Sequence, residues 1–257
     1  MNIKKIAVMS LSLLIPFLSL NISHADELDK IKSNGVMKIA ASGVFPPFSF
    51  VDTNNNVVGF DIDIANEIAK RLDVKSEIVT TPFDGIIAGL VTGRYNAVIG
   101  SMAITEERKK AVDFVGPYYR SGIGIFVKEG SAYKTLSSLE GKNVGAILGE
   151  TSEKWAREQN KFNLRTYKGL PEMLIDLNSG RVDAIISDDI VVYVAIKNND
   201  AKIVQIEDDN LPKFDIGMAI RKKNPDLAAA MKKALDDMMA DGTYEAISKK
   251  WVGTDIR

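Results

Sequence analysis

The chain has 257 residues, no cysteine and one histidine, and its 33 Lys and Arg residues nearly balance its 34 Asp and Glu residues. Without cysteine there is neither a disulfide nor a thiol for lipid attachment, so a domain of this size must be stabilised by burial of its apolar core. The near-neutral charge, with no basic block, argues against nucleic acid as a partner.

Residues 1–25 have the pattern of a cleavable secretory signal. A basic start, MNIKK, precedes an apolar run that leads to the small residues Ser23 and Ala25, and we expect cleavage after Ala25. A membrane anchor is the alternative, but the run is only marginally long enough to cross a bilayer and no basic cluster follows it. We therefore expect a protein exported to a periplasm and free of a lipid anchor.

The single histidine, His24, lies inside the predicted signal. A mature chain without His or Cys cannot use a Ser-His-Asp or Cys-His nucleophilic site, nor bind zinc through imidazole or thiolate. Loss of Lys4 and Lys5 with the signal leaves the mature chain slightly acidic. We expect neither a metal nor another cofactor.

Short strands alternate with helical segments from residue 36 onward. Strands are predicted over 36–42, 76–81 and 96–101, and helices over 61–73 and 83–94. The first helix repeats its apolar residues at helical spacing, namely Ile64, Ala65, Ile68, Ala69 and Leu72. Such alternation predicts an α/β protein with a parallel sheet covered by helices.

The same pattern then starts again. Strands are predicted over 142–148, 162–168 and 182–187, and helices over 150–159, 171–181 and 188–198. The segments LVTGRYNAVIGS and LNSGRVDAIISD can nearly be superposed, each with a helix end, Gly-Arg and a strand. Two such units in tandem predict two lobes, although one likeness between α/β segments can also arise by chance.

Two extended segments, YYRSGIGIFVKEG and FDIGMAIRKKN, connect these units, and helical segments over 224–242 and 243–253 follow. The simplest topology takes the chain into a second lobe and back again. We assign 26–118 and 219–257 to lobe 1, 123–214 to lobe 2, and 119–122 and 215–218 to two hinge crossings. Because ligands of open α/β sheets bind beyond the carboxyl ends of the strands, loops of both lobes should line the cleft.

Several motifs point to one protein family. They are FPPFSF, GFDIDIANEIAKRL, PFDGIIAGL, AITEERKKAVDF, YYRSG, Gly-Arg-Val-Asp-Ala and DGTYEAISKKW, in this order along essentially the whole mature chain. Together they resemble the periplasmic polar-amino-acid-binding proteins, the solute receptors of amino-acid ABC importers. The resemblance implies a two-lobe periplasmic-binding-protein fold of type II, with a mostly parallel sheet in each lobe. It also implies a monomer that binds a free L-amino acid and delivers it to a membrane permease.

The resemblance places the α-carboxylate of the ligand at Arg108, which closes the AITEER motif. A planar guanidinium matches a carboxylate through two hydrogen bonds, whereas the same charge run read alone is typical of a solvated helix. The α-ammonium would be bound by Asp188, with Asp189 as a competing candidate. Either aspartate could instead cap the helix that follows.

The remaining polar contacts are implied in the same way. Thr151, at a predicted helix N-terminus, would donate its N–H and hydroxyl to the carboxylate, although simple capping is compatible with the same position. The Ala103 N–H would reach the carboxylate too, and Ser101 would accept from the ammonium. Ala103 stands where the family usually has Ser or Thr, so one hydroxyl contact is lost.

The walls of the side-chain pocket are expected at Phe45 and Phe83, faced by Ile147 from lobe 2. Aromatic residues beside strands and helices often belong to the core instead, and for Phe83 the two interpretations are nearly balanced. We also include Ser42, which stands where relatives that bind basic or amide side chains often carry an acid.

The GETS segment contributes Glu150 and Ser152 as further candidates. Glu150 could supply the charge that Ser42 lacks, or it could merely favour the helix dipole. We expect a polar or cationic amino acid as the ligand.

An enzyme on the same scaffold is the alternative function. Some similar proteins are periplasmic dehydratases of cyclic carboxylic acids, and Glu150 could act as a general acid if burial raised its pKa. The presence of both Arg108 and Asp188 instead favours a ligand with two charged termini. We therefore expect a binding protein, whose use in uptake or in signalling is not marked by any motif.

Overall fold

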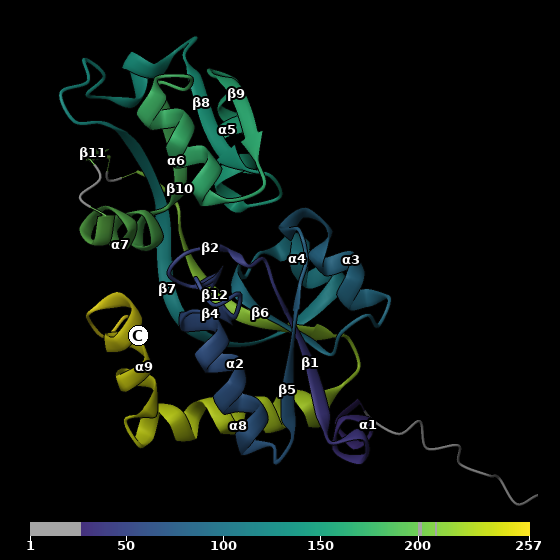
Figure 1. Ribbon diagram of the computed structural model, residues 1–257. Helices are drawn as coiled ribbons and strands as arrows, with labels where there is room; N and C mark the ends of the chain where they lie inside the picture. The colour runs from purple at the N-terminus through teal and green to yellow at the C-terminus, as the bar shows by residue number, and fades with distance from the viewer. Residues whose placement is uncertain (1–26, 200–201, 209) are drawn as a thin grey trace, which may run out of the picture.

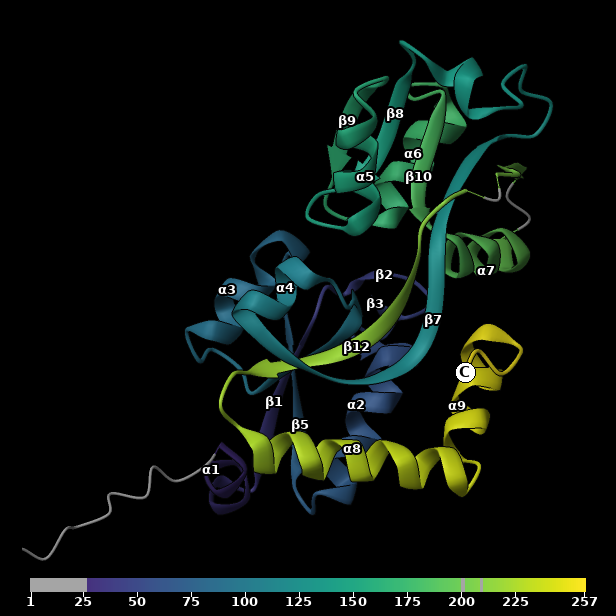
Figure 2. The same cartoon turned by 180° about the vertical axis from the view of Figure 1, so that it is seen from behind.

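The computed structural model describes residues 27–199, 202–208 and 210–257. The predicted signal peptide over 1–25, including His24, lies outside these residues. Figure 1 shows two bodies connected by long strands, and the view from behind in Figure 2 shows the same two strands passing between them. No helix in the described ranges combines the length and apolar character needed to cross a membrane.

The main strands follow the predicted segments, except for the strand over Ile203–Ile206, which was not predicted. They are β1 (Val36–Ala41), β5 (Lys75–Thr80), β6 (Ala97–Ala103), β7 (Val112–Lys128), β8 (Asn143–Ile147), β9 (Asn163–Tyr167), β10 (Ala184–Asp188), β11 (Ile203–Ile206) and β12 (Lys213–Arg221). Hydrogen bonds join them in the order β5-β1-β6-β12-β7-β10-β8-β9, and β11 pairs with β7. A second, small sheet contains β2 (Val44–Phe45), β3 (Ser49–Val51) and β4 (Val57–Val58).

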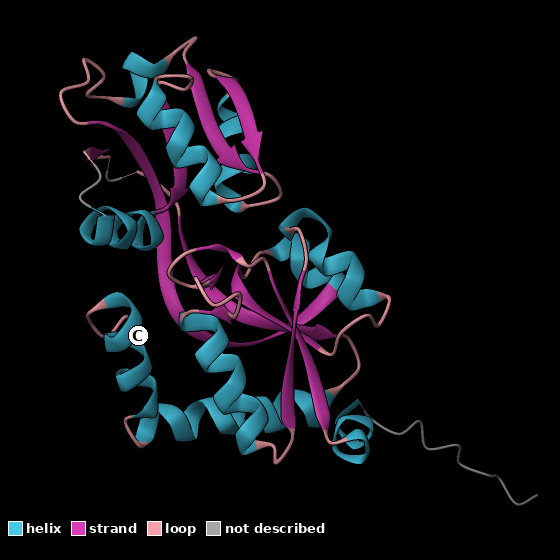
Figure 3. Cartoon of the chain, viewed as in Figure 1, coloured by secondary structure: helices cyan, strands magenta, loops and turns pink. Residues whose placement is uncertain are grey.

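Helices cover these strands, as Figure 3 shows by colour. They are α1 (Glu27–Asn34), α2 (Phe60–Arg71), α3 (Ile86–Val91), α4 (Glu106–Ala111), α5 (Thr151–Gln159), α6 (Leu170–Ser179), α7 (Asp189–Asn199), α8 (Pro225–Ala240) and α9 (Thr243–Val252), with 3₁₀ turns η1 (Phe83–Gly85) and η2 (Leu136–Leu139). Lobe 1 contains β1, β5 and β6 with α1 to α4, α8 and α9. Lobe 2 contains β8 to β11 with α5 to α7.

Parallel pairing forms the centre of each lobe. In lobe 1, β1 pairs in parallel with β5 and β6, and in lobe 2, β8 pairs in parallel with β9 and β10. The connecting strands β7 and β12 pair antiparallel with one another and with their neighbours. This arrangement confirms the predicted two-lobe α/β fold with a mostly parallel sheet in each lobe.

The predicted apolar face of the helix over 61–73 is buried. Ile64, Ala65, Ile68 and Ala69 of α2 are fully inaccessible to solvent, and α2 contacts β1, β5 and β6. Burial of one such aliphatic side chain contributes roughly 1.5–3 kcal/mol. The helical period therefore identified the face that stabilises lobe 1.

Three features differ from the expected elements. Helix α1 and the small sheet were not predicted, because two- and three-residue strands leave no readable alternation. The segment predicted as one helix over 83–94 is a 3₁₀ turn followed by the six-residue α3. Strand β11 was not predicted either.

Candidate functional site

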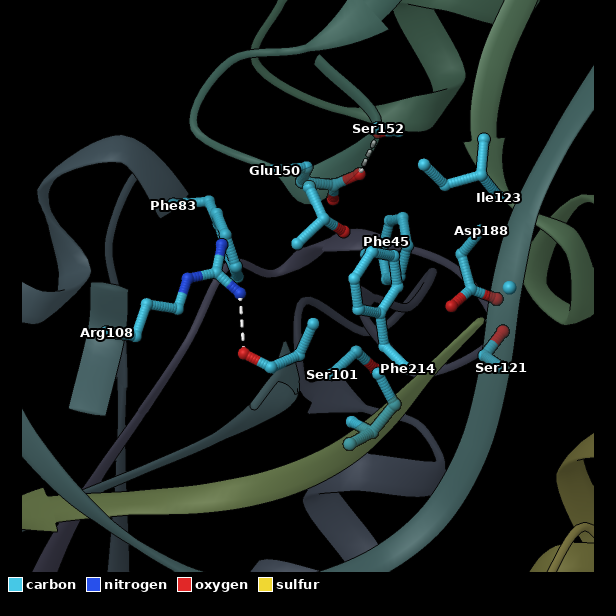
Figure 4. A pocket seen from close by; sticks show the side chains of 14 residues that line it. Phe45, Phe83, Ser101, Arg108, Ser121, Ile123, Glu150, Ser152, Asp188 and Phe214 are labelled. Atoms are coloured by element: carbon cyan, nitrogen blue, oxygen red, sulfur yellow. Dashed lines mark hydrogen bonds between the residues drawn. The ribbon is translucent and has the colours of Figure 1, made fainter. Parts of the chain in front are cut away.

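A pocket that is partly open to solvent lies between the two lobes. Figure 4 shows side chains of both lobes pointing into it. Its lining residues are Phe45, Phe83, Ser101, Ala103, Arg108, Ser121, Gly122, Ile123, Glu150, Thr151, Ser152, Asp188, Phe214 and Ile216. The set combines one cation, two acids, several small polar groups and an apolar wall.

Arg108 is held at one end of this pocket by local structure. Its helix α4 begins after Thr105, whose hydroxyl accepts a hydrogen bond from the Arg108 N–H at 3.2 Å. The guanidinium donates to the Ala103 carbonyl at 2.9 Å and, across the cleft, to the Gly149 carbonyl at 3.0 Å. Its Cζ lies 5.4 Å from the centroid of the Phe83 ring. These contacts occupy two of the five guanidinium N–H groups, so three remain for a ligand.

Burial lowers the pKa of Arg108, and the negative charges of Glu150 and Glu107 oppose that shift. A guanidinium stays protonated in proteins, so the pocket contains a fixed positive charge. Thr151 lies beside it as the first residue of α5, where the backbone N–H groups of a helix are not paired within the helix. This end of the pocket is suited to an anionic group.

Asp188 lies at the opposite end, where β10 meets α7 (Figure 4). Its Oδ1 accepts a hydrogen bond from the Val191 N–H at 3.1 Å, so it also caps α7. Burial, together with the charge of Asp189, raises the pKa of Asp188 to about 7. A carboxylate that is destabilised in this way gains most from a cation placed beside it.

Asp189 has a different position from its neighbour. Its Oδ1 accepts hydrogen bonds from the Ser121 hydroxyl at 2.8 Å, the Gly122 N–H at 3.0 Å and the N–H of the next residue, Ile190, at 2.7 Å. These bonds tie α7 to β7, and Asp189 does not line the interlobe pocket. The two aspartates that compete in the sequence are thus separated by the fold.

Ser101 comes from lobe 1, and its partner Asp61 lies close enough to Asp188 for the Asp188 charge to raise the pKa of Asp61. Its backbone has a φ of 56°, in the left-handed region that side chains other than Gly, Asn and Asp rarely adopt. Its hydroxyl donates to the fully buried Asp61 at 2.7 Å. Burial and the charge of Asp188 raise the pKa of Asp61 to about 7, against the effect of its two hydrogen bonds.

Glu150 enters the pocket from lobe 2, at the N-cap position of α5 (Figure 4). The Ser152 hydroxyl donates to its Oε2 at 3.3 Å. Burial and the charge of Asp188 raise the pKa of Glu150 to about 8, although the nearby Arg108 acts in the opposite direction. The pocket therefore contains more acidic than basic groups.

Comparison with known proteins identifies the family. The model of the bacterial extracellular solute-binding proteins, family 3, matches residues 37–254. The chain belongs to this family. The resemblance seen in the motifs is confirmed.

Individual relatives agree with this assignment. The solute-binding protein is 37% identical to the L-cystine-binding protein TcyJ of Escherichia coli K12, over 91% of this chain and 90% of the relative. It is 41% identical to an ancestral arginine-binding protein solved with arginine bound, with a TM-score of 0.79 over 84% of this chain and 98% of that one. It is also 38% identical to the ancestral amino-acid-binding protein AncCDT-1, a precursor of cyclohexadienyl dehydratase, with a TM-score of 0.81 over 88% and 99% of the two chains.

These relatives are binding proteins, and they do not favour the dehydratase alternative for the solute-binding protein. The pocket also contains no arrangement suited to a metal ion: within the described ranges, no group of three or more His, Cys, Asp or Glu residues could hold one.

The structure brings together most of the residues singled out in the sequence. Those that line the pocket are Phe45, Phe83, Ser101, Ala103, Arg108, Glu150, Thr151, Ser152 and Asp188. Two do not line it. The Ser42 hydroxyl lies 3.3 Å from the Ser49 hydroxyl, and Ile147 is buried in the apolar core.

Sequence reasoning missed five lining residues. Ser121, Gly122 and Ile123 come from β7, and Phe214 and Ile216 come from β12. They belong to segments interpreted only as crossings. The signal that could have found them is the position of both crossings between the lobes, next to the expected cleft.

The lobes of the solute-binding protein also touch across the mouth of the pocket. Lys154 of α5 forms an ion pair with Glu107 of α4, next to the Arg108 contact with Gly149. A Cβ at Gly149 would lie 2.9 Å from the Asp84 Cα, and the φ of 86° at Gly149 also favours glycine. The described structure thus has its lobes in contact.

Proposed function

We propose that this solute-binding protein binds a free L-amino acid between its lobes in a periplasm and, as a monomer, delivers it to the membrane permease of an ABC importer. The observation that carries the proposal is the position of Arg108 and Asp188 at opposite ends of one pocket (Figure 4). A free amino acid presents a carboxylate and an ammonium that these two side chains can bind simultaneously. The cystine and arginine named for the relatives support the same ligand class.

Ligand binding is expected to close the lobes. The hinge would lie at 119–122 and 215–218, between lobe 1 (26–118 with 219–257) and lobe 2 (123–214). Arg108 and Asp188 belong to different lobes, so a bound zwitterion gains contacts with both only when the lobes are together. A ligand shifts a conformational equilibrium by its difference in affinity for the two states, which here favours the closed one.

Gly169 offers a test of closure. A Cβ at this residue of lobe 2 would lie 2.6 Å from the Val44 Cβ of lobe 1, whereas its φ of −158° allows any side chain. Gly169→Ala should therefore oppose closure without straining the backbone, at a cost of roughly 1–3 kcal/mol, or about 5- to 150-fold in affinity. Gly85→Ala is the matched control, because nothing lies within 4 Å of its added Cβ.

Small-angle X-ray scattering measures the result. The parent and Gly85→Ala should become more compact with L-arginine, and Gly169→Ala should need a higher concentration to do so. Equal compaction at equal concentration in all three proteins would contradict this hinge.

Glu150 supports a ligand with a cationic side chain. A zwitterion balances Arg108 and Asp188, which leaves the Glu150 charge without a partner in the pocket. A basic side chain would supply that partner, since an opposite charge favours the ionised carboxylate. With an uncharged polar side chain, Glu150 would instead be protonated near neutral pH, in line with its pKa of about 8.

The function is tested by thermal shift and titration calorimetry with the twenty amino acids and L-cystine, after unfolding and refolding to remove carried-over ligand. At least one polar or basic amino acid should raise the melting temperature. Glu150→Gln should weaken the binding of L-arginine more than the binding of L-glutamine. If no amino acid stabilises the refolded parent, the proposal is wrong.

A further inference from the structure

Asp61 is a fully buried carboxylate that lies behind the pocket without lining it. Within the described part of the chain it forms no ion pair, and both of its oxygens accept hydrogen bonds from hydroxyl groups. Tyr118 Oη donates to Oδ1 at 2.7 Å, and Ser101 Oγ donates to Oδ2 at 2.7 Å. A buried carboxylate without a cation destabilises a folded protein, which points to a role other than stability.

The three residues form a closed network. Tyr118 Oη accepts a hydrogen bond from the Ser101 N–H at 3.0 Å and donates one to Asp61. Ser101 is thus bound through both its backbone and its side chain, which explains how a serine is held at a φ of 56°. Of the three, only Ser101 lines the pocket.

We propose that Asp61 is a positioning residue that makes Ser101 a hydrogen-bond acceptor for the α-ammonium of the ligand. A serine hydroxyl has one proton and two lone pairs. An ionised Asp61 can only accept hydrogen bonds, so the Ser101 hydroxyl donates its one hydrogen bond to Asp61. The lone pairs of the Ser101 oxygen are then left to face the pocket. Ser101 and Asp188 then present acceptors from two lobes to one ammonium. The inference rests on the proposed function, because it takes an amino acid as the ligand.

The substitution Asp61→Asn separates this role from simple packing. Asparagine has nearly the same shape but carries an NH₂ group, which can donate to Ser101 Oγ. The Ser101 proton is then free to point into the pocket, where it opposes an ammonium. Asp63→Asn is the matched control, because Asp63 lies on the same helix and accepts from Lys250 and Trp251 at the surface, both at 2.7 Å.

The experiment is a double-mutant cycle measured by titration calorimetry, with Asp61→Asn, Ser101→Ala and the double variant. L-arginine, L-glutamine and L-cystine are the probes, and the cycle uses whichever binds the parent most tightly. Asp61→Asn should weaken binding about tenfold or more in the parent and less than about threefold in the Ser101→Ala background. Asp63→Asn should leave binding within about twofold.

A second arm uses 5-guanidinopentanoic acid, which is arginine without its α-amino group, at concentrations up to its solubility. Asp61→Asn should bind this compound as tightly as the parent does. Additive effects in the cycle, or equal losses for both compounds, would overturn the inference while the proposed function stands. If Asp61→Asn does not fold, Ser101→Ala must show the same loss restricted to amino compounds. If none of the three probes binds the parent, the proposed function itself fails and the inference with it.

Discussion

The two ends of the pocket are constructed in opposite ways. At the arginine end, Arg108 already donates to carbonyl groups of both lobes, Ala103 in lobe 1 and Gly149 in lobe 2. At the aspartate end, Ser101 and Asp188 offer acceptors, and no cationic side chain is present there among the lining residues. The first end already connects both lobes in the described structure, whereas the second is completed only by a positive group from the ligand.

This difference predicts which property of ligand binding each end of the pocket controls. The pKa values of Asp61 and Asp188 are both about 7, well above their usual range, because both carboxylates are buried and each lies near another negative charge, Asp188 for Asp61 and Asp189 for Asp188. An ammonium between them would relieve both. The arginine end should therefore determine whether a carboxylate ligand binds at all, and the aspartate end should determine how binding depends on pH.

The largest expected effect comes from Arg108→Met. Removing one partner of a buried, hydrogen-bonded charge pair costs roughly 2–5 kcal/mol, so affinity for L-arginine should fall by about 30-fold to more than 1000-fold. Titration calorimetry measures the loss. Lys109→Met is the matched control, because this neighbour on α4 is exposed and forms an ion pair with Glu106, and it should change affinity little. Equal affinity of parent and Arg108→Met would show that the carboxylate binds elsewhere.

The next effect is expected from Asp188→Asn, which keeps the cap on Val191 because the amide oxygen can still accept. Ligand affinity should fall roughly 10- to 100-fold, in line with loss of a charge-assisted hydrogen bond. The ligand-free protein should nevertheless melt at a higher temperature at pH 8, because a buried carboxylate near Asp61 and Glu150 is removed. A lower melting temperature together with lower affinity would contradict the contrast between the two ends.

The smallest effect concerns pH. Because the pKa values of Asp61, Asp188 and Glu150 are raised to about 7–8, the ligand-free folded state binds more protons than the unfolded state between about pH 4 and pH 8. Its stability should fall as pH rises through that window. A ligand ammonium favours the ionised carboxylates, so affinity should instead fall as pH is lowered, by roughly tenfold from pH 8.5 to 6.5 if binding releases about half a proton on average over this range.

Calorimetry in buffers of different ionisation enthalpy counts the protons exchanged on binding. Proton release should be found in the parent near pH 7 and should be smaller in Asp188→Asn. Binding that is independent of pH between 6 and 8.5 would show that these carboxylates keep their ionisation state when the ligand enters.

Much of the architecture could be predicted from contiguous residues. The helical period of Ile64, Ala65 and Ile68 and the repeated strand-helix units predicted two α/β lobes correctly, since burial follows local periodicity. Arg108 was identified by its motif, and its position is again local: Thr105 caps a short helix that directs the guanidinium toward Ala103, five residues earlier. The sequence by itself therefore determined the fold class and the arginine end of the pocket.

The tertiary structure decided how the aspartate end is built. The resemblance favoured Asp188 over the adjacent Asp189, and the pairing of β10 with β7 places Asp188 in the pocket and Asp189 against Ser121. The hydrogen bond between Ser101 and Asp61 joins residues 40 positions apart. Likewise, residues of the hinge strands β7 and β12 line the pocket and Ser42 does not, because the partners of a side chain depend on which strands become neighbours. Local periodicity predicts which face of a helix or strand is buried. Which side chain lies opposite a given residue is set by contacts between segments that are distant in the sequence.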